Sequence, residues 1–298
     1  MIRTAGVLFF TACTMFFGQS GTQETNRPFL SRSEAHLEFR SLSPGEVIKA
    51  SIESPFAVKR AEIRFEKRTY AMGRGKESDP LFALVGLDLG LEPGDYPMIF
   101  TVVYAGGQYE RIEKEIRVLS KDFPVKKLWV DERYVSPPKE VLQRIREESA
   151  ILRSVYGIFT PRWQGEGAFV QPTKGRVVPN FGERRIFNNK PRNPHSGVDI
   201  SSPPGTAVIA SNSGKVVLAS DLYFAGKTVI IDHGLGVFTI YCHFSKFRAG
   251  RGEFVHKGQI IGEVGATGRV TGPHLHWAVK IQGTRVDPFS VMDLDFKP

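Results

Sequence analysis

The sequence predicts a mainly β protein with an N-terminal β-sandwich, a connecting amphipathic helix and a C-terminal compact antiparallel β domain. Three observations lead to this prediction. Apolar and polar residues alternate between residues 37 and 119, which is typical of strands that bury one face. Between residues 136 and 156, apolar residues recur with the period of an α-helix. From residue 165 onward, short apolar runs are separated by glycines, as in a small antiparallel sheet.

Length and charge narrow the class of protein. A chain of 298 residues has room for two domains of ordinary size. Its formal net charge of +9 suggests anionic surroundings, such as nucleic acid, an acidic membrane surface or a bacterial wall. The lysines and arginines are spread along the chain and no familiar nucleic-acid motif occurs, so we expect no nucleic-acid partner.

Residues 1–20 are typical of a secretory signal peptide. A basic residue precedes an apolar run over residues 5–17, and the small residues Gly18 and Ser20 suit a cleavage site. The run is too short to cross a bilayer. Lipidation at Cys13 is an alternative, but apolar residues continue after it. We expect an exported protein without stable membrane insertion after cleavage, in the periplasm, at the cell surface or secreted, with the periplasm favoured.

The alternating segment predicts an immunoglobulin-like β-sandwich over residues 25–122, without a catalytic constellation. Residues 123–164 form a linker that contains a helix over residues 137–156. Ser136 is the expected cap of this helix, and Gly157 is its expected end. We consider two roles for the helix: a packed connector, or a steric plug over a neighbouring site that the sandwich could also cover.

Most of the histidines lie in the C-terminal domain, which we place at residues 165–298. In the predicted strand GPHLHWAVKI, His274 and His276 point to one face, while Leu275 and Trp277 point to the core. A second segment, PHSGVDI, contains His195 and Asp199. Imidazole and carboxylate groups are both ligands of zinc.

A third segment, GVFTIYCHF, reads as another strand. Alternation places Tyr241 and His243 on one polar face and turns Cys242 to the opposite, apolar face. Neighbouring residues of a regular strand point apart, so we expect no nucleophile–base pair of Cys242 and His243. Since Cys242 is the one cysteine left after signal cleavage, no intramolecular disulfide can form.

These groups fit a catalytic zinc site. His195, Asp199 and one histidine of the pair His274 and His276 supply three ligands, which leaves a fourth position open for water. Such a zinc lowers the pKa of water and polarises a carbonyl oxygen. The remaining histidine and His243 could move protons beside the metal.

The motifs PHSGVDI, IYCHF and GPHLHW, in this order, resemble the signatures of lysostaphin- and LytM-type zinc metallopeptidases, which cut peptide cross-links in bacterial cell walls. The resemblance covers roughly residues 165–290. It implies that Zn2+ is bound by His195, Asp199 and His276, and that His243 and His274 are catalytic.

The expected function is therefore a zinc endopeptidase that hydrolyses cross-links or stem peptides of peptidoglycan. The alternative is a non-enzymatic wall-binding module, or an activator of another wall hydrolase, with a structural zinc. The segment VHKGQIIGEVG also resembles lipoyl- and biotinyl-type carrier hairpins, but the modifiable lysine of these is absent.

Four further residues are candidates for substrate binding. Tyr241 could contact the reacting carbonyl, since it shares the predicted face of His243. Asn180 and Arg184, with the neighbouring Arg185, could hold substrate carboxylates, although a solvated basic face is the alternative.

Overall fold

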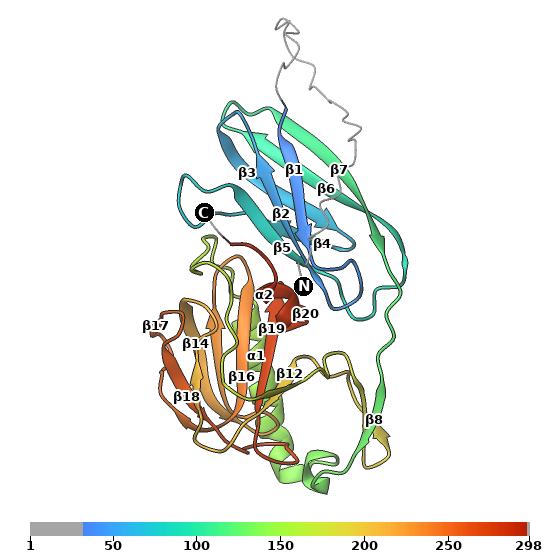
Figure 1. The fold of residues 1–298 in the computed structure, drawn as a ribbon, viewed down its shortest axis with the longest axis vertical. Coiled ribbons are helices and arrows are strands. Elements are labelled where there is room, and N and C mark those ends of the chain that lie inside the picture. Colours follow the sequence, from blue (N-terminus) through green and yellow to red (C-terminus); the bar gives the residue numbers. More distant parts are fainter. Residues whose placement is uncertain (1–31, 297–298) are drawn as a thin grey trace, which may run out of the picture.

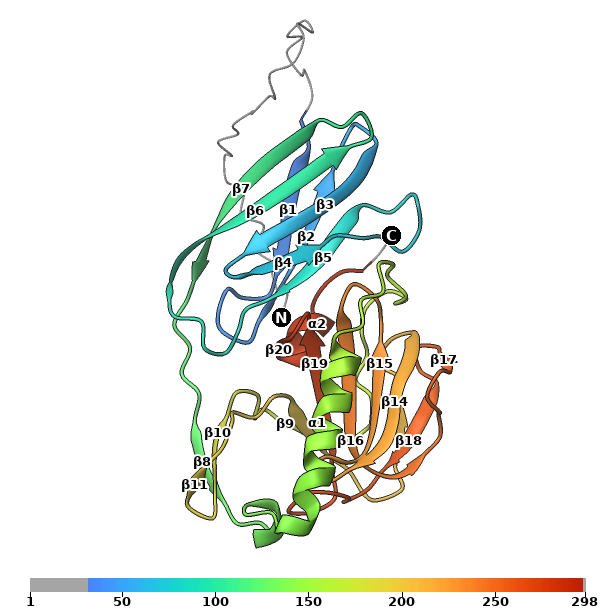
Figure 2. The ribbon, with the colours of Figure 1, turned by 180° about the vertical axis from the view of Figure 1, so that it is seen from behind.

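The structure is a computed structural model that describes residues 32–296; the predicted signal peptide lies outside the described residues. The predicted fold class is confirmed: a β-sandwich stands at one end of a larger antiparallel sheet, with a helix against that sheet (Figures 1 and 2). Between residues 32 and 296, no helix is long and apolar enough to cross a membrane.

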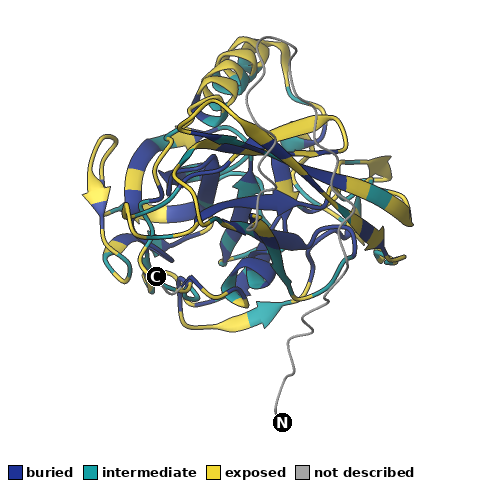
Figure 3. Cartoon of the chain, turned by 90° about the horizontal axis from the view of Figure 1, so that it is seen from above, coloured by how far each residue is buried: buried dark blue, intermediate teal, exposed yellow. Residues whose placement is uncertain are grey.

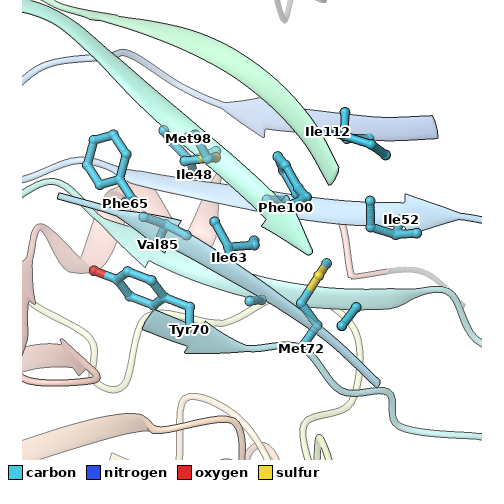
Figure 4. Close-up of a cluster of buried hydrophobic side chains, with 14 of the residues drawn as sticks. Ile48, Ile52, Ile63, Phe65, Tyr70, Met72, Val85, Met98, Phe100 and Ile112 are labelled. Atoms are coloured by element: carbon cyan, nitrogen blue, oxygen red, sulfur yellow. The ribbon is translucent and has the colours of Figure 1, made fainter. Parts of the chain in front are cut away.

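The sandwich consists of two antiparallel sheets. Buried apolar residues alternate along the strands and fill the space between the sheets, among them Ile48, Ile63 and Phe100 (Figure 4). One sheet has the order β1 (Glu34–Phe39), β2 (Val47–Glu53), β5 (Leu81–Gly86). The other has the order β4 (Arg68–Ala71), β3 (Val58–Phe65), β6 (Gly94–Tyr104), β7 (Tyr109–Val118).

The connecting region contains short strand β8 (Val125–Leu128), two turns of 3-10 helix (Glu132–Tyr134 and Lys139–Val141) and helix α1 (Leu142–Tyr156). Ser136 does not cap the helix as predicted. The 3-10 turn Lys139–Val141 lies between Ser136 and α1, and the Ser136 hydroxyl donates to Glu132 instead. Gly157 follows the last helical residue, as predicted.

Helix α1 packs on the C-terminal sheet through its apolar stripe, where Val155 is buried. The ring of Tyr156 contacts that of Phe238 edge-on, with centroids 5.7 Å apart. On the polar side, Glu148 accepts from Arg144 at 2.6 Å and from the backbone N–H of Tyr223 at 2.8 Å. These contacts suit a packed connector.

The C-terminal sheet has ten strands. Seen from above, buried residues lie in the interior of the molecule and exposed residues at its periphery (Figure 3). Its main path follows the order β17 (Phe254–Val255), β14 (Gly214–Leu222), β15 (Gly226–Asp232), β16 (Val237–Phe247), β19 (Leu275–Ile281), β12 (Val198–Ser201), β9 (Arg176–Val178). Beside this path lie β13 (Ala207–Ile209), β18 (Ile260–Val264) and β20 (Thr284–Val286). A separate small sheet has the order β11 (Lys190–Pro191), β10 (Arg184–Phe187), β8.

Strand β16 contains a β-bulge, which the prediction from regular alternation of its side chains did not include. Its register against β15 slips after Tyr241, and His243 adopts a positive φ of 68°. Cys242 lies opposite His276 of β19 and so shares its face, while Tyr241 lies opposite Trp277, on the core side. The prediction that Tyr241 and His243 share a polar face, with Cys242 turned away, is therefore wrong.

An apolar cluster joins the sandwich to the C-terminal sheet. It combines Phe82 and Leu84 of β5 with Trp163 from the linker and Val279 of β19. Helix α2 (Pro288–Met292) follows β20 and adds Val291 to this cluster. Because both parts share one buried cluster, the domain boundaries at residues 122 and 165 stay predictions.

His233 contacts the rings of Trp163 and Phe169 of this cluster and is fully buried. Its Nδ1 is 2.7 Å from the carbonyl oxygen of Ser213, and its Nε2 is 2.7 Å from the hydroxyl of Thr239. Burial lowers the pKa of His233 from 6.5 to about 4. The unfolded chain therefore binds a proton in this pH range that the folded chain does not.

We predict that the stabilisation provided by neutral His233 is complete above pH 6.5 and is lost as the pH falls toward 4. The full loss is about 3 kcal/mol, from about 1.36 kcal/mol for each pKa unit. Denaturant unfolding measures the free energy of unfolding of the parent and of His233→Gln. The difference between these two free energies should become smaller as the pH falls from 6.5 toward 4. The exposed His256 serves as the control in His256→Gln, and parallel curves for the parent and His233→Gln would contradict the prediction.

Candidate active site

Two strands of the C-terminal sheet place the predicted metal ligands together. Asp199 of β12 pairs directly with His276 of β19, so their side chains share one face of the sheet. His195 comes from the loop before β12, and its ring centroid lies 4.7 Å from that of His276. Gly197 permits this approach, because a Cβ there would lie 2.4 Å from the carbonyl oxygen of Trp277.

The donor atoms of these three residues converge. His195 Nε2 lies 2.9 Å from His276 Nδ1 and 3.2 Å from Asp199 Oδ1, and His276 Nδ1 lies 3.0 Å from the same oxygen. Two imidazole nitrogens and one carboxylate oxygen form a donor set that zinc and similar divalent ions prefer. The cluster therefore fits a metal ion, and the individual ligand roles stay predictions.

Three histidines have the same hydrogen-bonding arrangement. The Nδ1 atoms of His195, His243 and His274 lie 2.8 to 3.0 Å from backbone carbonyl oxygens of Asn180, Thr267 and Gly272 respectively. A carbonyl accepts only, so in the neutral rings the proton resides on Nδ1 and Nε2 carries a lone pair. For His195, this lone pair faces the cluster.

His243 and His274 stand beside the cluster. Their ring centroids are 5.0 Å apart, and His274 Nε2 lies 3.6 Å from Asp199 Oδ1. Burial, together with the neighbouring charges of His276 and His274, lowers the pKa of His243 to about 3. Burial lowers the pKa of His195 to about 4. Both rings are thus held neutral, as ligand and base roles require.

Asp199 is held by two residues whose roles differ from those predicted. Its Oδ2 accepts hydrogen bonds from Asn180 Nδ2 at 2.8 Å and from Arg185 Nη2 at 2.9 Å. Burial raises the pKa of Asp199, but hydrogen bonds with His195 and His276 outweigh burial and lower it well below its ordinary value. The carboxylate is therefore ionised and fixed, with Oδ1 toward the histidines.

The predicted substrate-binding residues require correction. Asn180 lines the cleft but is buried, and its amide contacts the carboxylate and the backbone N–H of Asp199, so it orients a candidate ligand. Arg184 is exposed and does not line the cleft, because alternation along β10 turns Arg185 inward instead. Tyr241 is fully buried and its hydroxyl contacts Ser211 Oγ at 2.6 Å, so it cannot reach a substrate carbonyl.

Cys242 lies on the cleft side of the sheet together with His243, contrary to the prediction, because the bulge in β16 breaks the alternation. Burial raises the pKa of the Cys242 thiol to about 12. The thiol is therefore protonated at neutral pH and is a poor nucleophile.

The five predicted residues open into a cleft of about 650 Å3. One wall includes Tyr156 at the end of α1, and the opposite wall includes Leu128 of β8 and Phe187 of β10; Figure 2 shows α1 and the small sheet on opposite sides of the intervening β9. Among the described residues, none from β1 to β7 lines the cleft. The steric-plug role of α1 stays a prediction.

Sequence reasoning missed five of the six basic residues that line the cleft, among them Arg192 and Arg269. The available signal was the position of Arg269 in the glycine-rich segment just before His274.

Comparison with known proteins agrees with this geometry. Residues 193–288 match the model of peptidase family M23. A crystal structure from Pseudomonas aeruginosa, described provisionally as a peptidase M23, superimposes with a TM-score of 0.65 at 32% sequence identity. The match covers 85% of this chain and 96% of that one. The chain belongs to peptidase family M23.

Two curated relatives are similar to the M23 region. The peptidoglycan DD-endopeptidase ShyA of Vibrio cholerae is 42% identical over 116 residues, which is 39% of this chain and 27% of ShyA. The DD-carboxypeptidase/endopeptidase Mpg of Neisseria meningitidis is 44% identical over 97 residues, 33% of this chain and 22% of Mpg. The match thus spans about a quarter of the length of these relatives.

We predict that Asn180→Ala weakens binding of zinc to this M23 chain by about 10- to 100-fold, because Asp199 loses a partner that orients it. Competition with a chromophoric chelator measures the affinity. Asn193→Ala, in the exposed part of the same cleft, is the matched control and should bind zinc as the parent does. Equal affinities for both variants would show that Asn180 does not position the ligand.

Proposed function

We propose that this chain is an exported zinc endopeptidase that hydrolyses peptide cross-links of bacterial peptidoglycan. The observation that carries the proposal is the convergence of His195, Asp199 and His276 beside His243 and His274, in one cleft of an M23 chain. The similarity to ShyA, a peptidoglycan DD-endopeptidase, supports peptidoglycan as the substrate, and the DD-type activity of both ShyA and Mpg supports a bond between D-residues as the target.

Each residue has a role suited to its geometry. His195, Asp199 and His276 would hold the metal, with Asn180 and Arg185 fixing the carboxylate. A bound zinc ion would supply Lewis-acid polarisation of the scissile carbonyl and a lower pKa for the attacking water.

His243 and His274 are the proposed acid–base pair. With protons on Nδ1, their Nε2 atoms are available to accept a proton from water and to return it to the leaving amine. Hydrolysis is complete when the acyl carbon has gained the hydroxyl group and the amine nitrogen a hydrogen.

A non-enzymatic wall-binding or activating protein with a structural zinc is the other candidate. A closed structural site has four protein ligands, whereas three residues form the candidate metal cluster among residues 32–296. This count favours an open coordination position and hence the enzyme.

We predict that the purified protein releases fragments from labelled peptidoglycan and that a zinc chelator stops this release. His195→Ala should lose metal and activity together. His274→Ala should retain metal and lose activity by about 100- to 10,000-fold, as expected for removal of an acid–base group. Mass spectrometry of the fragments identifies the bond.

His256→Ala is the matched control, since His256 is exposed and outside the cleft. It should digest peptidoglycan as the parent does. If His195→Ala and His274→Ala also digest it normally, the proposed active site is wrong. If no protein releases fragments, the binding or activating role replaces the enzyme.

A further inference from the structure

Arg269 lies in the cleft wall, clamped between two aromatic rings. Its guanidinium carbon is 4.8 Å from the ring centroid of Phe187 and 5.1 Å from that of Phe224. Phe187 belongs to β10 of the small sheet and Phe224 to the turn between β14 and β15 of the ten-stranded sheet, so parts of two sheets fix one side chain. Contact with aromatic faces leaves the N–H edges of a guanidinium available for an acceptor.

No carboxylate neutralises Arg269 within residues 32–296, where it forms no ion pair and no side-chain hydrogen bond. Burial, and then the charges of Arg192 and Arg185, lower its pKa to about 10. An arginine that is partly desolvated and surrounded by other cations is costly to hold unless an anion arrives. This cost points to a ligand that carries negative charge.

The rest of the cleft also has more positively charged than negatively charged side chains. Its lining has one carboxylate, Asp199, which the histidines and Arg185 already engage. Arg192 donates to the carbonyl oxygen of Val135 at 2.6 Å and has no acidic partner in the described part of the chain. Six lysines and arginines line the cleft: Lys126, Arg185, Arg192, Arg269, Lys280 and Arg285.

We propose that Arg269, assisted by Arg192, binds a free carboxylate on a substrate residue that adjoins the scissile bond. The proposal rests on the proposed peptidase function and specifies its substrate class. The planar guanidinium can donate two parallel N–H bonds to a carboxylate, and its aromatic clamp keeps it oriented. Arg269 is thus a specificity-determining residue, and Arg185, which is engaged by Asp199 and Glu183, is not.

This assignment separates two kinds of wall cross-link. In a D-alanyl–diaminopimelate link, the carbon that bears the scissile nitrogen also carries a free carboxylate. A glycine bridge has no carboxylate beside its internal bonds. A site built around Arg269 therefore favours diaminopimelate-type links over glycine bridges.

The test uses two synthetic cross-linked peptides that differ at one group: the diaminopimelate carboxylate in one is a carboxamide in the other. The parent should show a kcat/KM about 10- to 100-fold higher for the carboxylate peptide, as expected for loss of a charge-assisted hydrogen-bonded pair. Arg269→Met keeps apolar contact with the two rings and should bring this ratio close to one. Arg269→Lys keeps the charge without the fork and should give an intermediate ratio.

Arg251→Gln removes one positive charge from an exposed loop outside the cleft and should leave the ratio at the parent value. Melting temperature and zinc content of each variant establish that fold and metal are retained. An unchanged ratio in a folded, zinc-loaded Arg269→Met would overturn the proposal.

Binding separates this proposal from the proposed function. Affinity of the metal-free parent and of Arg269→Met for the two peptides is measured by calorimetry. If the parent cleaves neither peptide but binds the carboxylate form more tightly through Arg269, the carboxylate site stands and the peptidase function fails. If the parent cleaves both peptides equally and binds them equally, the carboxylate site fails and the peptidase function stands.

Discussion

His195 Nε2, Asp199 Oδ1 and His276 Nδ1 lie 2.9 to 3.2 Å from one another, and the surrounding structure depends on holding these electron-rich atoms together. Such atoms repel unless a proton or a cation lies between them. The pairing of β12 with β19 sets their spacing, and Asn180 anchors the carboxylate from behind. These contacts fix the positions of the donor atoms, and donors that are already oriented lower the ordering cost of binding a cation.

The core behind the cluster provides the rigidity that this arrangement needs. Leu275 and Trp277 alternate with His276 and are fully buried, so β19 cannot shift its register without exposing them. On the neighbouring strand, Tyr241 fills the same core and bonds Ser211. The bulge that follows Tyr241 then turns His243 into the cleft, which regular alternation on this strand would not do.

The sequence was sufficient for features that depend on local periodicity and on motif identity. Alternation correctly predicted the sandwich and the two faces of β19, and the three motifs brought His195, His243 and His274 to one expected site. It failed at Tyr241, because a single bulged residue reverses every later side chain and leaves no mark in the hydrophobic pattern.

Other parts of the site depend on long-range contacts that the sequence does not encode locally. Asn180 and Asp199 are far apart in the chain, and only the pairing of β9 with β12 brings the region of Asn180 beside the carboxylate. The choice between Arg184 and Arg185 depends on which face of β10 meets the cleft, and the small sheet with β8 sets that face.

The positively charged residues of the cleft differ in their neighbours. Ion pairs within the cleft would remove the repulsion among its cations, but each carboxylate placed there would also compete with an anionic substrate for the same donors. Arg185 illustrates the first arrangement, since Asp199 and Glu183 neutralise it and it serves to hold a ligand. Arg269 shows the other arrangement, in which an arginine has no carboxylate partner. Aromatic faces support its guanidinium without consuming its hydrogen-bond donors. The same residue type thus has two roles a short distance apart, and the neighbours of each arginine determine which role it has.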